Sequence, residues 1–178
     1  FRWLMDRLGQ MALPVETEHH GDAIHSQILP LLDARDGRQD VRAWVRTYVD
    51  THSVAYAAAY SQHRQRDDQR QVYMNIAFPL PYSQMTSVLR LDTLTAADKI
   101  QTLCLTSLPV QQQFGDQGVY WVIRGFGVRL PINETIQVFT PEQGSDWPAE
   151  VLPQTKLLAQ HDMWVLGLHC LRLHYLIY

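Results

Sequence analysis

The longest regular hydrophobic pattern of the chain lies between Gln39 and His63. Apolar and aromatic residues recur there at i, i+3, i+4 and i+7, the spacing that gathers side chains on one side of an α-helix. Arg46, Asp50 and Ser61 fall on the opposite side. The pattern predicts an amphipathic helix of about five to seven turns with one buried stripe. The stripe comprises Val41, Trp44, Val45, Tyr48, Val49, His52, Ala55, Tyr56, Ala59, Tyr60 and His63.

Two shorter helices are predicted ahead of this one. Apolar residues in Phe1–Leu13 recur at helical spacing, and a second helix over Ala23–Ala34 has Asp22 as its N-terminal cap. The segment Arg64–Arg70 mixes charges of both signs and is typical of a solvated linker. These elements make residues 1–70 a predicted helical segment.

After Gln71 the hydrophobic period changes from helical spacing to alternation, which is typical of half-buried strands. Gly125 and Gly127 interrupt one predicted strand and indicate a bulge or a sharp bend. Gly167 lies between two alternating segments and predicts a hairpin. The predicted strands cover residues 72–78, 85–91, 100–108, 119–130, 135–140, 157–166 and 168–177.

Helices followed by strands with short connections predict an α+β fold. We expect N-terminal helices, including the long amphipathic one, to pack on a curved antiparallel meander of about six or seven strands. The whole chain, residues 1–178, is expected to form one domain, with the sheet in residues 71–178. A chain of this length buries roughly 70% of its unfolded surface.

Composition narrows the choice of partners. The chain is 46% hydrophobic and 19% charged, which is typical of a globular protein, and its formal net charge is -3. That charge gives no reason to expect a nucleic acid partner. The apolar segment Leu157–Tyr178 contains several charged or ionisable residues, so we expect no membrane span within the chain. We find no signal peptide, and the sequence does not tell whether an anchor precedes Phe1.

Cys104 and Cys170 are the two cysteines, and their spacing matches no zinc or redox motif. Both lie in predicted strands, so we expect two buried free thiols. The alternative is a disulfide between neighbouring strands, which requires an oxidising compartment.

The best candidate for a binding site lies on the predicted helix. His52 and His63 fall among tyrosines near the centre of its stripe. They are either core histidines with hydrogen-bonded rings or the polar end of a pocket between helix and sheet. Arginines of the predicted sheet, such as Arg90 and Arg124, could hold an anionic group there or could be solvent-facing. The predicted ligand-binding residues are Tyr48, His52, Tyr56, His63, Trp121 and Arg124.

The segment from Glu16 to His25 is rich in potential metal ligands. His20-Gly21-Asp22 matches part of a two-histidine, one-carboxylate iron site, with His161 or His169 as the distal ligand. Such a motif needs a strand, whereas helices are predicted on both sides, so we expect no metal and no cofactor.

No motif for catalysis is specific. On the last predicted strand, Cys170, Arg172 and His174 share one face while His169 lies on the other, which disfavours a thiol protease. The sequence has no G-x-S-x-G elbow and no phosphate-binding glycine motif.

Three hypotheses of function follow. The first is a non-catalytic binding domain that holds an apolar or amphipathic small molecule between helix and sheet. The first alternative is a protein-interaction subunit, or a homodimer, of a larger assembly, because the segment Leu168–Tyr178 is unusually apolar. The second alternative is a small enzyme that uses a buried histidine as base or a metal at the His19–His25 cluster.

Overall fold

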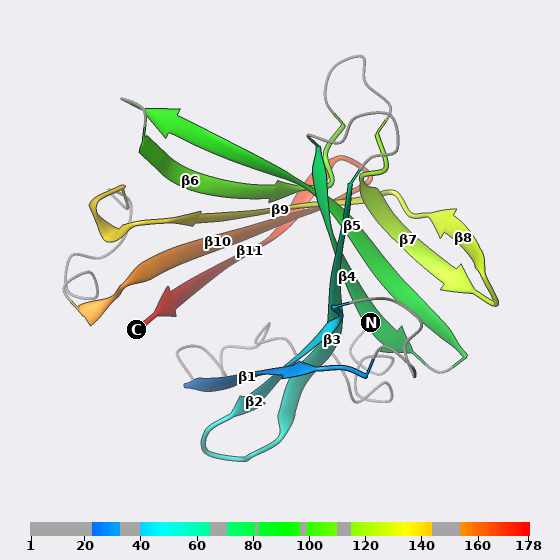
Figure 1. The fold of residues 1–178 in the computed structure, drawn as a ribbon, viewed down its shortest axis with the longest axis horizontal. Coiled ribbons are helices and arrows are strands. Elements are labelled where there is room, and N and C mark those ends of the chain that lie inside the picture. The colour runs from blue at the N-terminus through cyan, green and yellow to red at the C-terminus, as the bar shows by residue number, and fades with distance from the viewer. Residues whose placement is uncertain are drawn as a thin grey trace. The chain divides into compact units, whose positions relative to one another are not determined.

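A computed structural model describes residues 23–32, 40–64, 71–80, 82–96, 99–109, 115–143 and 154–178 of the chain. These residues form β-strands and one short 3-10 helix (Figure 1). The elements are β1 (Ile24–Pro30), β2 (Arg42–Tyr48), β3 (Val54–Arg64), β4 (Val72–Leu80), β5 (Ser83–Ala96), β6 (Lys99–Thr106), β7 (Gly118–Ile123), β8 (Phe126–Arg129), β9 (Ile132–Phe139), η2 (Pro141–Gln143), β10 (Leu157–Val165) and β11 (Leu168–Ile177).

The predicted α+β class is wrong, because no α-helix occurs in the described parts of the chain. The long amphipathic helix predicted over residues 39–63 is instead the antiparallel pair β2 and β3, in which Trp44 lies opposite Ala58. The helix predicted over Ala23–Ala34 is replaced by β1, which pairs with β2. The helix predicted over Phe1–Leu13 lies outside the described residues.

A tight reversal separates β2 from β3 where the helix was expected to continue. His52 has a φ of 54°, and its backbone N–H donates to the carbonyl of Tyr48 at 3.0 Å. The Thr51 hydroxyl accepts from the backbone N–H of Ser53 at 3.3 Å. Hydroxyl side chains stabilise such turns in competition with helical hydrogen bonds. The helical periodicity was misleading because the same segment is rich in aromatic and β-branched residues, which favour strands.

The described chain forms two compact units. The first comprises residues up to 62, 75–86 and 120–128, and the second comprises 63–74, 87–119 and 129–178. The prediction of a single domain stays a prediction.

In the first unit, β1, β2 and β3 are antiparallel neighbours. One side of β2 and β3 carries an aromatic cluster in which Trp44 contacts Tyr56 and Tyr60, with ring centroids 5.7 and 5.3 Å apart. Tyr56 also meets Phe78 of β4 at 5.9 Å. The guanidinium of Arg46 lies over the rings of Trp44 and Tyr56, which is favourable because the ring face is electron-rich.

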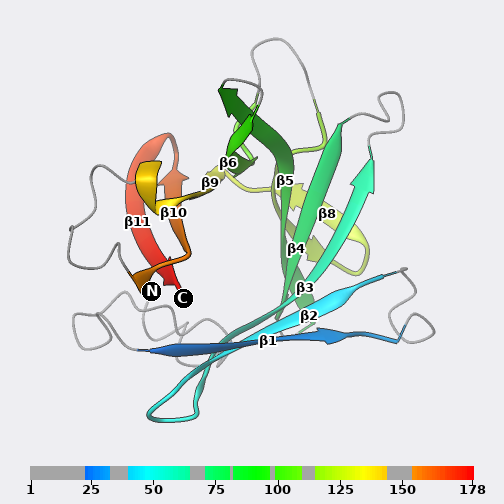
Figure 2. The ribbon, with the colours of Figure 1, turned by 60° about the vertical axis from the view of Figure 1, so that its left-hand side comes forward.

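The second unit contains the antiparallel order β5-β6-β9-β10-β11. Figures 1 and 2 both show β9, β10 and β11 running side by side. Its buried side chains include Tyr73, Leu89, Val119 and Leu158, each at most 1% exposed. The hairpin predicted about Gly167 is confirmed by the pairing of β10 with β11.

The strand predicted over residues 119–130 is two strands, β7 and β8. Arg124 and Gly125 form the turn between them, with φ values of 49° and 85°. Two successive residues with positive φ make the turn type whose twist matches a two-residue hairpin. The sharp bend indicated by Gly125 is therefore a complete reversal of the chain.

Candidate functional site

Strand register in the second unit brings polar side chains from five strands onto one side of the sheet. The first row of cross-strand neighbours is Arg90, Thr106, Thr135, Asp162 and Arg172. The second row, two residues along each strand, is Asp92, Cys104, Gln137, Gln160 and His174. Residues two apart on a strand share a side of the sheet. We call these two rows the polar face.

The other side of the same strands is mostly apolar. Its corresponding rows are Leu91, Leu105, Ile136, His161 and Leu173, then Thr93, Leu103, Val138, Ala159 and Tyr175. An antiparallel sheet often has one apolar face and one polar, solvated face. Here the polar face is not simply solvated, because Thr106 and Asp162 are each only 6% exposed.

Asp162 is the best-connected residue of the polar face. Its Oδ1 accepts from Nε of Arg172 at 2.6 Å and lies 2.7 Å from Nε2 of His169. Its Oδ2 accepts from the amide of Gln160 at 2.6 Å. Burial raises the pKa of Asp162, but the hydrogen bonds from Arg172, Gln160 and His169 outweigh burial and hold that pKa below its ordinary value. Asp162 is therefore a fixed negative charge at neutral pH.

A register shift explains why His169 reaches Asp162. Met163 pairs with Leu171 while Trp164 pairs with His169, which leaves Cys170 as the extra residue of a β-bulge. The bulge turns His169 onto the side that carries Arg172, so the predicted placement of His169 on the opposite face is wrong. The imidazole also meets the ring of Trp164 edge-on at 5.4 Å.

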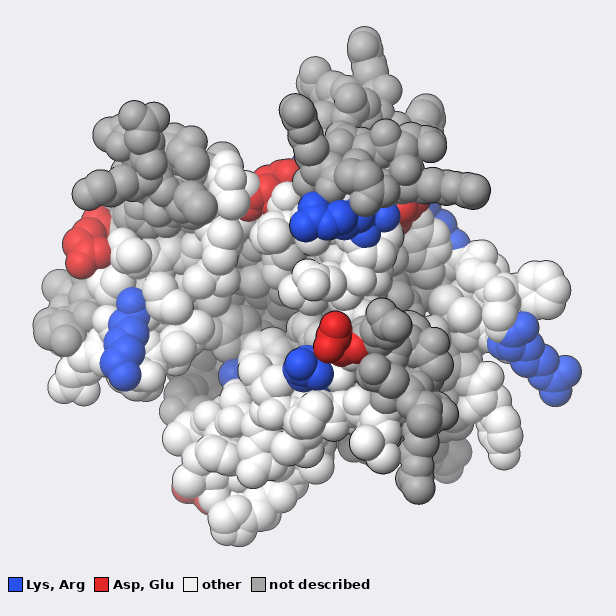
Figure 3. All heavy atoms as spheres, viewed as in Figure 1, with Lys and Arg blue, Asp and Glu red and all other residues white. Residues whose placement is uncertain are grey.

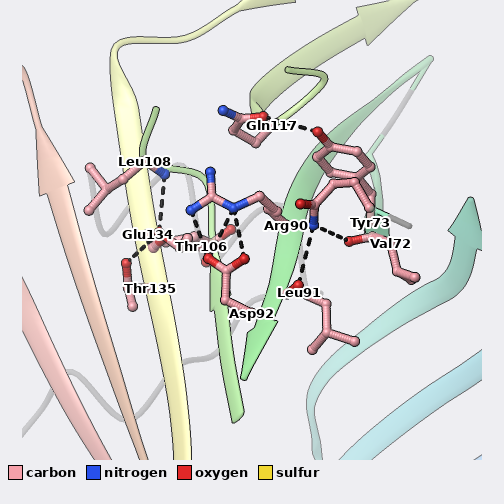
Figure 4. Close-up of polar contacts among 11 residues, drawn as sticks. Val72, Tyr73, Arg90, Leu91, Asp92, Thr106, Leu108, Gln117, Glu134 and Thr135 are labelled. Atoms are coloured by element: carbon pink, nitrogen blue, oxygen red, sulfur yellow. Dashed lines mark hydrogen bonds and ion pairs between the residues drawn. The ribbon is translucent and has the colours of Figure 1, made fainter. Parts of the chain in front are cut away.

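The opposite end of the polar face is held by Arg90 and Asp92 (Figure 4). Nε and Nη2 of Arg90 donate to the Asp92 carboxylate at 2.7–3.0 Å. The hydrogen bond to Asp92 raises the pKa of Arg90 despite partial burial. Nη1 of Arg90 is buried and has no hydrogen-bond partner among the described residues. Next to this pair, the hydroxyls of Thr106 and Thr135 are 2.8 Å apart.

A second carboxylate–histidine pair lies on the apolar side. Nε2 of His161 is 2.7 Å from Oε2 of Glu134, whose side chain is 8% exposed. The backbone N–H of Glu134 donates to the hydroxyl of Ser107 at 2.8 Å. Because both members are enclosed and satisfied, this pair has the character of a core interaction.

The predicted ligand-binding residues are divided between the two units. Tyr48 is buried at the end of β2, and His52 is exposed in the following turn. Tyr56 belongs to the aromatic cluster of the first unit.

Of the remaining three predicted residues, His63 belongs to the second unit, and Trp121 and Arg124 belong to the first. His63 stacks on Tyr73 at 5.0 Å and lies 3.2 Å from a carboxylate oxygen of Asp116. Trp121 is 44% exposed on β7, and Arg124 is exposed in the β7–β8 turn. The pocket predicted between helix and sheet has no counterpart, because the described residues contain no helix to form it.

The cysteines are free, as predicted, but only Cys104 is partly buried. Burial, reinforced by the charge of Asp92, raises the pKa of the Cys104 thiol, and Arg90 opposes this rise. Cys170 is exposed, so its predicted burial is wrong. Its thiol donates to the carbonyl of Met163 at 3.3 Å rather than to a histidine.

We looked in this arrangement for two features of catalytic sites, a nucleophile beside His169 and a group of metal ligands. Asp162 orients His169 as a carboxylate orients a general base, but no hydroxyl or thiol there is recorded within hydrogen-bond reach of that ring. The described parts of the chain also contain no group of three His, Cys, Asp or Glu residues placed to hold a metal ion. His19, His20 and Asp22 lie outside them, and His25 is exposed on β1.

Part of this site was accessible from the sequence. Alternation in residues 157–166 puts Gln160 and Asp162 on the same face of one strand. Alternation in residues 168–177 puts Arg172 and His174 on the same face of the next strand. The sequence does not indicate the order of the strands in the sheet. It therefore could not show that five strands each contribute two residues to the polar face.

On the face drawn in Figure 3, the described Lys and Arg side chains lie in small separate groups, some of them beside acidic residues. The prediction that nucleic acid is not a partner rests on composition and stays a prediction.

The chain is 32% identical over 177 residues to the uncharacterized membrane protein YndJ of Bacillus subtilis (strain 168). The match covers 99% of this chain but 28% of that protein, so the chain spans less than a third of the length of this relative. No family model matches the chain. No solved structure matches it. In the described residues there is no helix with the length and hydrophobicity needed to cross a membrane.

Proposed function

We propose that the chain is a non-catalytic binding domain of a larger membrane protein, and that the polar face of the second unit is its binding surface. The membrane context comes from the similarity to YndJ. The observation that carries the proposal is the strand register that aligns arginine, aspartate, glutamine and histidine in two adjacent rows.

Removing the charged groups of the polar face from water costs free energy, which favours a functional role for these groups. Enclosing paired charges generally stabilises a fold less than apolar side chains of similar volume would. The side chains of Arg90 and Asp162 are 13% and 9% exposed, so both are largely removed from water. The presence of such groups on several neighbouring strands favours recognition of a ligand over simple packing.

The remaining hydrogen-bonding capacity defines the class of ligand. Both oxygens of Asp162 already accept hydrogen bonds, whereas Arg172 uses only Nε for that carboxylate. Arg172 therefore offers two further nitrogens, and its side chain is 51% exposed. His169, 42% exposed, lies beside it. Guanidinium groups bind carboxylate and phosphate oxygens well, so the ligand is a molecule with an acidic, acceptor-rich group.

The test is a titration of the 178-residue chain with citrate and with inorganic phosphate, followed by NMR of the arginine Nε–H and histidine ring signals. We expect saturable shifts that are weakened roughly tenfold or more by Arg172→Met, the loss of one charge-assisted interaction. Arg129→Met, which removes an exposed arginine of the same unit, is the matched control. Equal affinities in the two variants, or no saturable shift, would refute the proposal.

This proposal changes the ligand of the sequence hypothesis. An apolar molecule between helix and sheet would need a helix, which the described residues lack. Binding itself stays a prediction.

The alternative function, protein interaction, is favoured by the β7–β8 hairpin in the first unit. Gly127 packs near Val122 and Leu130 donates to Val119, which sets a register with four apolar side chains on one side of the hairpin. These are Trp121, Ile123, Phe126 and Val128, exposed by 44%, 38%, 80% and 60%. Analytical ultracentrifugation of the chain and of Phe126→Ser tests self-association here. A monomer at all concentrations would exclude a homodimer formed by this hairpin.

A further inference from the structure

From the end of the β10–β11 hairpin, we infer that this tip inserts into the interfacial region of a lipid bilayer. The tip comprises Trp164, Val165, Leu166, Gly167 and Leu168, all within the second unit. This inference rests on the membrane context of the proposed function and adds a contact that the polar face does not supply.

The tip has an unusual residue at the first position of its turn. Leu166 and Gly167 have φ values of 52° and 80° and connect Val165 to Leu168 in a two-residue hairpin. The first position of this turn normally holds Asn, Asp or Gly, because a larger side chain is strained at positive φ. Leu166 accepts that strain while 75% exposed, so it gains no compensating burial within the described structure. The backbone N–H of Leu166 donates to the carbonyl of Pro131 at 2.8 Å, but no burial of the leucine side chain offsets the strain. Strain of this kind favours a functional contact where, as here, the neighbouring residues are apolar and exposed as well.

The surroundings of Leu166 are apolar as well. Leu168 is 73% exposed and Val165 is 41% exposed. From Met163 to Leu171 the chain contains no Lys, Arg, Asp or Glu. An uncharged exposed tip matches the lipid acyl region better than it matches water, because the transfer of apolar surface out of water is favourable.

Trp164, together with the polar residues further from the tip, sets the depth to which the hairpin can insert. Tryptophan is enriched where a membrane meets water, because its ring is largely apolar and its N–H is polar. Leu166 is two residues beyond Trp164, about 7 Å along an extended strand. Interfacial elements insert by about 5–10 Å, so the leucines can reach the acyl boundary while Trp164 lies at the headgroups. Arg172 and Asp162 then stay on the aqueous side.

Insertion of a single hairpin tip gives only a weak affinity for the membrane, as expected for a contact that adds to another attachment. Transfer of a leucine side chain into hydrocarbon changes a partition coefficient by roughly tenfold or more. Such a contact suits a domain that its parent protein already holds close to the bilayer, where the effective concentration of lipid is high.

The experiment is flotation of the 178-residue chain with vesicles of neutral phosphatidylcholine over a range of lipid concentrations. Leu166→Asn is the key variant, because asparagine tolerates positive φ and removes the apolar side chain. We expect it to lower the partition coefficient roughly tenfold while leaving the chain at least as stable as the unmodified one.

Tyr82→Asn is the matched control. Tyr82 lies in the turn between β4 and β5 with a φ of 59° and is 98% exposed, so the same replacement relieves the same strain elsewhere. We expect this variant to bind vesicles as the unmodified chain does. Equal losses in both variants, or no flotation of the unmodified chain, would overturn the inference.

The depth of Trp164 in the bilayer is a second, independent measurement of insertion. Phosphatidylcholine with brominated acyl chains should quench tryptophan fluorescence, and Trp164→Phe should remove most of that quenching. Quenching that persists in Trp164→Phe would contradict insertion through this hairpin. Citrate binding should survive Leu166→Asn, and flotation should survive Arg172→Met, so failure of one idea is distinguishable from failure of the other.

Discussion

Replacement of Asp162 by asparagine is the most informative perturbation of the fold. Asp162 accepts from Arg172, His169 and Gln160 at 2.6–2.7 Å. Asparagine keeps one acceptor oxygen and places an NH2 group where the second was, so at least one donor would face another donor.

The expected loss of stability depends on how exposed the hydrogen-bond partners of Asp162 are. A hydrogen bond to a charged group contributes about 1.5–3 kcal/mol when enclosed. The side chains of Arg172 and His169 are about half exposed, so solvent weakens their share. We therefore expect Asp162→Asn to lower the free energy of unfolding by about 2 kcal/mol at pH 7. With a urea dependence of about 2 kcal/mol per molar, the midpoint moves down by about 1 M.

The dependence on pH provides the sharper test. Because the pKa of Asp162 is lower in the folded protein than in the unfolded chain, its contribution is complete above the unfolded pKa of about 4. It is lost as the pH falls through the lower, folded pKa. The difference in stability between Asp162→Asn and the unmodified chain should therefore stay constant from pH 7 to about 5 and shrink in more acidic solution.

Urea denaturation followed by circular dichroism at several pH values measures this difference. Asp50→Asn, at an exposed position in the β2–β3 turn, is the control and should change stability little. A difference for Asp162→Asn that is near zero at pH 7, or that is the same in acid, would refute the assigned hydrogen bonds.

Two further predictions concern packing and thiol reactivity. Gly115→Ala should lower the free energy of unfolding by about 1–3 kcal/mol, because the added methyl would press on Gln117 and on the hydroxyl of Tyr73, a side chain 1% exposed. Gly127→Ala, whose methyl would meet only Val122 at 3.9 Å, should cost less in the same denaturation assay, and the reverse order would contradict the packing described. Iodoacetamide at pH 8 should modify exposed Cys170 well before Cys104, whose pKa is raised by burial, as followed by mass spectrometry of tryptic peptides. Equal rates would show that Cys104 is open to solvent.

Several local elements could be predicted because their information is local. Alternation in residues 157–166 and 168–177, with glycine between them, was sufficient for the β10–β11 hairpin. Gly125 correctly indicated a bend, although the bend is a full hairpin turn.

The prediction of a long helix over residues 39–63 failed because two periodicities fit the same residues. Tyr56 and Tyr60 are four apart, which suits one side of a helix, and an even spacing also places them on one side of a strand. Pairing of β3 with β2 then decided in favour of the strand, since Arg46 lies opposite Tyr56 and supplies a cation–π contact.

The sequence by itself determined which residues alternate within each strand of the C-terminal part, where glycine permits a reversal, and that the formal net charge is only -3. Only the tertiary structure decided that Asp162 faces Thr135 on one side and Arg172 on the other, and that a bulge at Cys170 brings His169 to the same carboxylate. The reason is physical: side-chain direction along a strand follows from local geometry, whereas strand order and register depend on hydrogen bonds between residues far apart in the chain.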